Sequence, residues 1–252
     1  MIDLTAIRDG LARGEFFLEY LPVIELSDDR CVGAEALIRW RRASGLVSPG
    51  QFIPFVENTP LSVFITYWVM DTVHAELGDW LRANPDAYIS INIPPEILGR
   101  GGIEYAASRS GLIKLASQVM LEITERGVPD QIGVESISRA RVSGVKIALD
   151  DVTLVGGANM AILARSPFDA IKLAKSLLDQ ISPAGPSPEW LTTIKVLAES
   201  SPVVVIAEGV ETEYQVARLR AAGSIQEAQG FYFSRPIPAG AFIAYHRDRN
   251  AE

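Results

Sequence analysis

The sequence predicts an α/β fold with a TIM-like (β/α)8 barrel, and three observations support this. Apolar runs rich in β-branched residues alternate along the chain with segments in helical spacing, which is typical of a parallel sheet covered on both faces. About eight such runs fit into 252 residues, as a single barrel of this type requires. Hydrophobic residues make up 48% and charged residues 21%, so the composition is that of a globular protein.

The elements follow one another without a convincing linker, so residues 1–252 are predicted to form a single domain. The clearest helix is expected from Leu61 to Leu81, where apolar side chains recur every three or four residues. The predicted strands cover residues 16–20, 31–38, 88–93, 119–123, 145–149, 170–173, 203–207 and 230–233.

Composition and charge exclude several classes of function. The net charge of −8 leaves no broad basic surface for polymeric nucleic acid or an anionic membrane. A lone cysteine, Cys31, excludes an internal disulfide and suits a reducing cytoplasm, where we expect the chain. With two histidines, any metal would be held mostly by carboxylates and amides, which favours Mg²⁺, Mn²⁺ or Ca²⁺. No signal peptide or membrane span is predicted, although the chain could be one module of a larger protein.

Polar residues interrupt or end most of the apolar runs. A lone carboxylate in a buried strand costs several kcal/mol to ionise, so any one of them could be a cap or part of a local salt bridge. Seven runs with such residues are better explained by a barrel mouth, where the C-terminal ends of parallel strands meet. The residues are Glu35, Asn92, Glu122, Asp150 with Asp151, Lys172, Glu208 and Gln229.

The carboxylates in this set predict a cation site. Crowded together without a cation, they would repel one another and some would be protonated. With Asn92 as a neutral oxygen ligand they suit one or two hard divalent ions, and a pair of ions is a standard arrangement for phosphodiester hydrolysis. Lys172 would then hold the attacking water or neutralise phosphoryl charge, and the alternative is a structural ion pair with a barrel carboxylate.

The motif Glu35-Ala36-Leu37 resembles the signature that names the EAL-domain family of cyclic di-GMP phosphodiesterases. The resemblance extends from about Ile7 to His246, and its motifs occur in the family's order. They are Phe52-Ile-Pro-Phe-Val-Glu57, Asn92, Glu122-Ile-Thr-Glu125, Asp150-Asp151, Lys172, Ala207-Glu208-Gly-Val-Glu211-Thr212, Gln229-Gly230 and Ser234-Arg-Pro236.

The resemblance implies a modified (β/α)8 barrel that hydrolyses cyclic di-GMP to linear pGpG with Mg²⁺ or Mn²⁺. By position, the implied metal ligands are Glu35, Asn92, Glu122, Asp150, Asp151 and Glu208, and the implied catalytic residues are Lys172, Glu35 and Gln229. Glu125 corresponds to a glutamate that anchors the loop after the Asp-Asp strand. Family members commonly dimerise beside that loop, so the resemblance is compatible with a homodimer. An acidic barrel with an altered loop on that side could also have a protein partner.

Three departures from the family pattern stand beside these matches. The loop after Asp151 is rewritten over residues 152–159, so Glu125 could lack its usual partners. Ala174 replaces a carboxylate two residues beyond Lys172, and Leu21 replaces an amide expected to face the dinucleotide. Each could weaken metal or substrate binding.

Leu37, Arg39 and Gln229 are predicted to contact the dinucleotide. For Arg39 a structural ion pair is an equal alternative to a phosphate contact.

Two functions compete on this sequence. A metal-dependent phosphodiesterase is favoured because the implied ligands and Lys172 are all present. A cyclic di-GMP receptor or protein-interaction module with little catalysis would suit the altered loop, Leu21 and Ala174. A barrel that binds neither metal nor dinucleotide ranks well below both.

Overall fold

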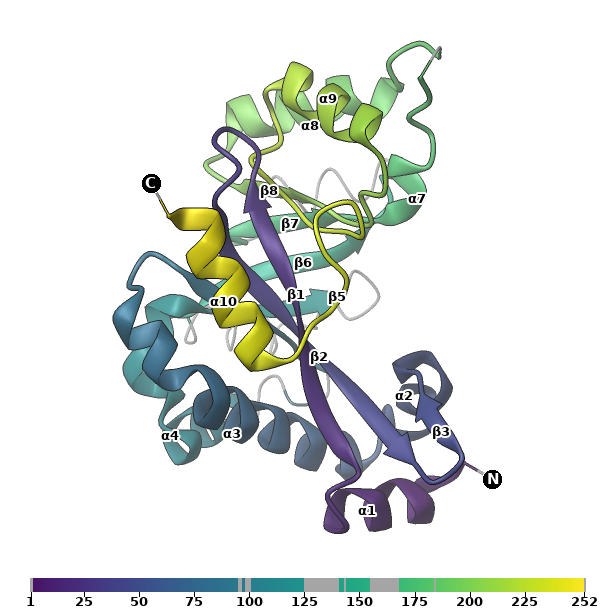
Figure 1. Cartoon of the computed structure of the whole chain (residues 1–252), viewed down its shortest axis with the longest axis vertical. Helices are drawn as coiled ribbons and strands as arrows, with labels where there is room; N and C mark the ends of the chain where they lie inside the picture. The colour runs from purple at the N-terminus through teal and green to yellow at the C-terminus, as the bar shows by residue number, and fades with distance from the viewer. Residues whose placement is uncertain are drawn as a thin grey trace.

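The computed structural model describes residues 2–94, 97, 101–124, 141–142, 144–154, 168–183 and 185–251. Within these ranges nine strands form one sheet, and eight of them close into a ring in the order β1–β9–β8–β7–β6–β5–β4–β2 (Figure 1). The strands are β1 (Phe16–Glu25), β2 (Cys31–Arg42), β3 (Gly45–Val47), β4 (Tyr88–Asn92), β5 (Val119–Thr124), β6 (Lys146–Val152), β7 (Ala170–Leu173), β8 (Val204–Ala207) and β9 (Glu227–Ala228). The predicted barrel is confirmed.

One strand of the ring runs against the others. β1 pairs antiparallel with both β2 and β9, whereas all other neighbours in the ring pair parallel. The connection from β1 to β2 is only residues 26–30, and a short hairpin can join only antiparallel strands. The prediction of a parallel sheet therefore fails for β1, and this reversal is what modifies the (β/α)8 pattern.

The strand predicted at residues 230–233 is wrong. Its place in the barrel is taken by β9, which ends before Gln229. Gly230 has a φ of +152°, and a Cβ there would lie 2.3 Å from the Val210 nitrogen, so the chain turns in tight contact with its neighbour. The Phe233 amide then donates to the Gly230 carbonyl at 3.0 Å. The aromatic residues of this segment have a composition typical of a strand, but their backbone forms a turn.

Helices pack around the ring, and the predicted helix from Leu61 to Leu81 is confirmed as part of α3. Thr59 caps its start, where the hydroxyl accepts from the Leu61 amide at 3.2 Å, and Pro60 occupies the first turn. In the described residues no helix is long and apolar enough to cross a bilayer. The helices are α1 (Leu4–Ala12), α2 (Pro49–Val56), α3 (Pro60–Ala83), α4 (Gly102–Ser110), η2 (Leu112–Gln118), α7 (Lys175–Leu178), α8 (Glu189–Ser200), α9 (Glu213–Ala222) and α10 (Ala239–Asn250).

The last helix covers the reversed strand. α10 lies along β1 in Figure 1, and its Phe242 ring stacks on Tyr20 of β1 at 6.0 Å. The same ring meets Trp80 of α3 edge-on at 4.9 Å. Asn250 at the end of α10 bonds both the amide and the carbonyl of Cys31, at 2.9 and 3.0 Å. The C-terminal helix thereby joins β1, β2 and α3.

An apolar layer fills the barrel interior below its mouth. The buried side chains that form it are Val23, Tyr88, Met120, Ala148, Ala170 and Ile206. Because side chains alternate between the two faces of a strand, the residue two positions after each of the last four also points inward. Those residues are Glu122, Asp150, Lys172 and Glu208, so the apolar layer supports a polar one.

The close approach of β2 and β4 generates a prediction. A Cβ on Gly33 would lie 2.4 Å from the Tyr88 carbonyl oxygen, whereas nothing lies within 4 Å of a Cβ on Gly240. We expect Gly33→Ala to destabilise the protein by at least about 2 kcal/mol, because backbone atoms must move. Gly240→Ala in the first turn of α10 should be neutral or slightly stabilising. Urea unfolding of the two variants checks this, and equal stabilities would contradict it.

Candidate active site

At the mouth of the barrel, side chains from six strands or their ends surround the ammonium group of a residue on a seventh strand. Lys172 on β7 is 1% exposed, and its Nζ lies 2.7 Å from Glu122 Oε1 and 2.7 Å from Glu208 Oε1. Glu35 Oε2 lies at 3.2 Å and Asp150 Oδ1 at 3.6 Å from the same nitrogen. Four of the predicted carboxylates therefore surround the predicted lysine.

Two amides complete the arrangement by holding Glu35. The Asn92 amide donates to Glu35 Oε1 at 2.8 Å, and the Gln229 amide donates to Oε2 at 2.7 Å. Gln229 also donates to Glu208 Oε1 at 2.9 Å. Both oxygens of Glu35 are thus bonded, and this fixes the orientation of its carboxylate.

Backbone pairing beyond the ends of β8 and β9 positions Glu208 and Gln229. The backbone N–H of Gln229 donates to the Ala207 carbonyl at 2.8 Å. The backbone N–H of Val210 donates to the backbone carbonyl of Gln229 at 3.1 Å. Tyr232 then donates to the Val210 carbonyl at 3.0 Å. This ladder carries the two side chains into the mouth, although neither residue lies inside a strand.

A bulge in β6 separates the two adjacent aspartates. The register of β6 against β7 shifts between Leu149 and Val152, and Asp151 has a φ of +57°, in the left-handed region. Asp150 faces Lys172, whereas Asp151 is exposed. Within the described ranges Asp151 has no ion pair with Lys172, so the structure brings one of the two aspartates into the cluster.

The crowding of charges shifts the pKa values of the cluster. Burial opposes the charged form of Lys172, yet the carboxylates of Glu122, Glu208 and Glu35 raise its pKa well above the usual value. Burial and the charge of Glu35 raise the pKa of Glu122 well above its ordinary range. Burial also raises the pKa of Glu208, to about 7. For Glu35 burial is outweighed by Lys172, Gln229 and Asn92, which lower its pKa.

The donors of the site suit a hard cation. Glu122 Oε2, Asp150 Oδ1 and Gln229 Oε1 are buried without a hydrogen bond, whereas Glu122 Oε1 is paired with the Lys172 ammonium at 2.7 Å. Unbonded oxygens beside excess negative charge are the ligands that Mg²⁺ and Mn²⁺ prefer. In the described part of the chain, however, no three acidic, cysteine or histidine side chains are spaced to hold an ion. Lys172 stands among the carboxylates, so a cation would have to displace its ammonium.

Several predicted residues lie outside this cluster or outside the described residues. Arg39 is half-buried and pairs with Glu19 at 2.8 Å, which is the structural alternative to a phosphate contact. Leu37 is half-buried farther along β2 than Glu35. Leu21 lies opposite Glu35 in the register of β1 with β2, and Ala174 is buried after β7. Glu125 lies outside the described residues.

Sequence reasoning missed a polar pair deeper in the barrel. The Tyr88 hydroxyl donates to Glu227 Oε2 at 2.5 Å, and burial raises the pKa of Glu227 to about 7 although that hydrogen bond opposes the shift. The period-two spacing offered a signal, because Glu227 precedes Gln229 by two residues and Tyr88 precedes Asn92 by four.

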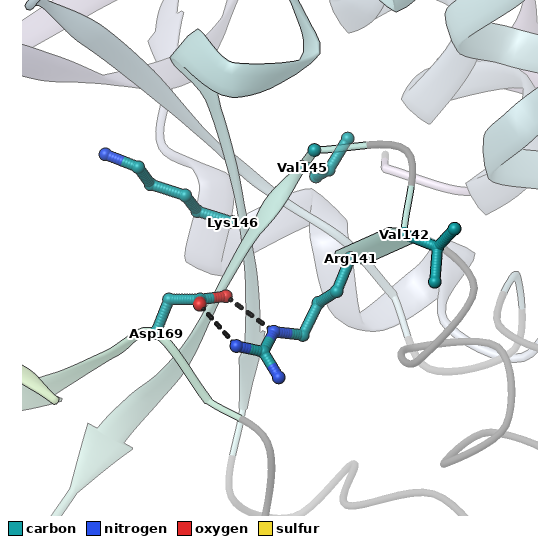
Figure 2. Close-up of a pocket in the computed structure, with 6 residues that line it drawn as sticks. Arg141, Val142, Val145, Lys146 and Asp169 are labelled. Carbon is teal, nitrogen blue, oxygen red and sulfur yellow. Dashed lines mark hydrogen bonds and ion pairs between the residues drawn. The ribbon is translucent and has the colours of Figure 1, made fainter. Parts of the chain in front are cut away.

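A hollow of about 360 Å³ lies at the other end of β6 and β7, where these strands begin. Figure 2 shows the Arg141 guanidinium turned toward Asp169, to which it donates at 2.8 and 3.1 Å. Asp169 also accepts from the Ile147 amide at 2.9 Å, so both oxygens serve the local fold. This hollow therefore lacks the unbonded oxygens that mark the mouth.

Comparisons with known proteins agree with the geometry. A family model described as EAL domain matches residues 4–236. The uncharacterized protein Rv1357c of Mycobacterium tuberculosis is 33% identical over 249 residues, which is 94% of this chain and 80% of that protein. The probable cyclic di-GMP phosphodiesterase PdeB of Escherichia coli K12 is 31% identical over 243 residues, covering 95% of this chain and 46% of PdeB. The PaMucR phosphodiesterase, solved as a c-di-GMP complex, superposes with a TM-score of 0.84 and 29% identity, covering 95% of this chain and 98% of that one.

The central lysine generates a stability prediction. Lys172→Met leaves its carboxylates buried without a cation, and breaking a buried pair in this way costs about 3–5 kcal/mol. The carboxylates can take up protons in acid, so we expect a larger loss of Tm in metal-free buffer at pH 8 than at pH 5. Lys175→Met is the matched control, since Lys175 pairs with Glu211 on an exposed surface. Equal losses for the two variants at pH 8 would refute the expectation.

Proposed function

Because the chain belongs to the EAL-domain family, we propose that it is a metal-dependent phosphodiesterase that hydrolyses cyclic di-GMP to linear pGpG. The observation that carries this proposal is the buried cluster at the barrel mouth, where four carboxylates and two amides converge around Lys172. Residues 1–252 act in this proposal as one EAL-type barrel domain.

The cation would be Mg²⁺ or Mn²⁺, as one or two ions. A bound divalent ion lowers the pKa of a coordinated water and stabilises charge on phosphoryl oxygens. Glu122 and Asp150, each with a buried oxygen that accepts no hydrogen bond, are the ligands that the geometry favours most. The remaining proposed ligands are Glu35, Asn92, Asp151 and Glu208.

Lys172, Glu35 and Gln229 carry the proposed catalytic roles. Lys172 is the ammonium at the centre of the cluster, and in this proposal Nζ, displaced from the carboxylates by the cation, donates hydrogen bonds to the water or to phosphoryl oxygens. Glu35 is held by Asn92 and Gln229 and orients the water. Water attacks phosphorus, the bond to the 3′ oxygen breaks, and that oxygen takes up a proton. The proton that the water loses balances the one that the 3′ oxygen gains, and Glu122 and Glu208 stay charged as proposed ligands of the cation.

Leu37, Arg39 and Gln229 are proposed to contact the dinucleotide. Arg39 would exchange its ion pair with Glu19 for a phosphate oxygen, or contact the ligand from beside that pair. Cyclic di-GMP is therefore the proposed ligand, and a homodimer or a protein partner is compatible with it. The cytoplasm is the proposed location, in keeping with the single cysteine.

A second candidate function is a cyclic di-GMP receptor with little catalysis. Lys172 already pairs with the carboxylates, and a cation must displace it before the site is loaded. Leu21, placed opposite Glu35, offers no amide to the ligand, and Ala174 offers no carboxylate. The two functions differ in turnover, which a direct assay measures.

The first test is conversion of cyclic di-GMP to pGpG with Mg²⁺, with Mn²⁺ and with a chelator. We expect metal-dependent product from the wild-type chain and a loss of at least about a thousandfold in Glu35→Ala, because a carboxylate that orients the attack is removed. Circular dichroism of that variant checks that it folds. A fully active Glu35→Ala would refute the site, and dinucleotide binding by calorimetry without product would establish the receptor.

The departures from the family pattern give a second test. We expect Leu21→Gln and Ala174→Asp to raise kcat/KM or dinucleotide affinity by about threefold to tenfold, as one added polar contact in a partly buried site would. Leu46→Gln, an exposed change on β3, serves as the control. Unchanged kinetics in both variants would show that other residues supply those contacts.

A further inference from the structure

A cross-barrel hydrogen bond lies directly beneath the polar cluster. Tyr88 belongs to β4 and Glu227 to β9, two strands that β2 and β1 separate in the ring. The Tyr88 hydroxyl nevertheless reaches Glu227 Oε2 at 2.5 Å through the barrel interior. The bond thus spans the barrel as a chord and joins strands that share no backbone pairing.

Tyr88 lies in the core of the barrel, and the Glu227 side chain is half-buried beside it. Tyr88 is 4% exposed and packs with Val23, Met120 and Ile206 in the apolar layer. Other charged groups lie around it: the Lys146 ammonium is 5.6 Å from the centre of the Tyr88 ring, and the charges of Glu25 and Lys146 act on Glu227. The hydroxyl is the hydrogen-bond partner that the Glu227 carboxylate has in this layer. A buried polar group that loses its partner costs about 1–3 kcal/mol, so the pair is strongly held together.

The two ends of this bond stand below the two amides that hold Glu35. On β4, Tyr88 and Asn92 share the inward face, since they are four residues apart, and Asn92 donates to Glu35 Oε1. On the other side, Glu227 and Gln229 are two residues apart and therefore lie on the same face of the chain. The Gln229 side chain donates to Glu35 Oε2. Any shift of β4 relative to β9 would therefore change the distance between the two donors that orient Glu35.

We propose that Tyr88 and Glu227 are positioning residues, and that their hydrogen bond fixes the spacing of Asn92 and Gln229 around the Glu35 carboxylate. Neither residue touches the reacting atoms. Measuring this effect as a reaction rate rests on the proposed function, whereas the hydrogen bonds themselves do not depend on it. Its consequence is that the lower layer of the barrel sets the rate of the reaction in the upper layer.

The primary variant is Tyr88→Phe, which removes one hydroxyl from the barrel interior. We expect kcat for cyclic di-GMP to fall about tenfold with KM within twofold, because a misplaced Glu35 affects the attack more than ground-state binding. Glu227→Gln retains an acceptor for the hydroxyl and should remain within about threefold of wild type. Tyr105→Phe is the matched control, since Tyr105 on α4 is 59% exposed. Tyr88→Phe with wild-type kcat would overturn the proposal.

The double variant Tyr88→Phe/Glu227→Leu separates positioning from stability. It removes both polar groups, so Tm should recover toward wild type relative to Tyr88→Phe, in which the half-buried Glu227 carboxylate is left without the hydroxyl. Because the chord is still absent, kcat should stay low. Recovery of kcat together with Tm would show a merely structural pair and overturn the inference.

Failure of the proposed function is distinguishable from failure of this inference. If wild type makes no pGpG, the hydrolase proposal fails, and the same variants are compared by calorimetry with cyclic di-GMP and, separately, with Mn²⁺ alone. We then expect weaker binding of at least one of them in Tyr88→Phe and in the double variant but not in Glu227→Gln. Identical binding across all four proteins would overturn the positioning role.

Discussion

The contact between the Lys172 ammonium and its carboxylates is the interaction on which the mouth of the barrel depends. Glu35, Glu122, Asp150 and Glu208 come from four different strands or their ends, and at close range they would repel one another. A single cation at 2.7–3.6 Å from each lets them remain together away from water. The pKa shifts follow from this crowding, since Lys172 holds its proton tightly while Glu122 and Glu208 hold theirs more tightly than free carboxyls.

The barrel interior explains why these charges can be buried. Below them lies an apolar layer whose small residues, Ala148 and Ala170, leave room for the ring of Tyr88. Gly33 contributes to the same fit, because any side chain there would meet the backbone of β4. The polar layer thus rests on buried, packed side chains, and electrostatic catalysis requires polar groups that are held in place before the reaction. The Tyr88–Glu227 bond adds a chord across that layer.

The reversed strand β1 shapes the site without contributing a charge to it. Its antiparallel pairing places Leu21 opposite Glu35, and its hairpin brings Glu19 of β1 beside Arg39 of β2. α10 covers β1 and ties it to α3 through Phe242. Differences between an efficient phosphodiesterase and a receptor are therefore expected on this side of the mouth and at Ala174, where polar groups are replaced by apolar ones.

The class of fold and the inventory of the site follow from the amino-acid sequence alone. Alternation along each strand is a local property, so apolar runs ending in Glu122, Asp150 or Lys172 are sufficient to predict inward-facing polar groups. The same reasoning misassigned the last strand, because the aromatic residues after Gly230 resemble a strand while the glycine's close approach to Val210 produces a turn.

Several features of the site depend on the closure of the barrel and could not be predicted from the periodicity of the sequence. The direction of β1, the placement of Lys172 among four carboxylates and the exclusion of Asp151 by a bulge all depend on which strands become neighbours. The Tyr88–Glu227 bond joins residues 139 positions apart, and only the diameter of the closed barrel brings them within hydrogen-bonding distance. Local pattern fixes which way a side chain points, whereas contacts across the barrel require the tertiary structure.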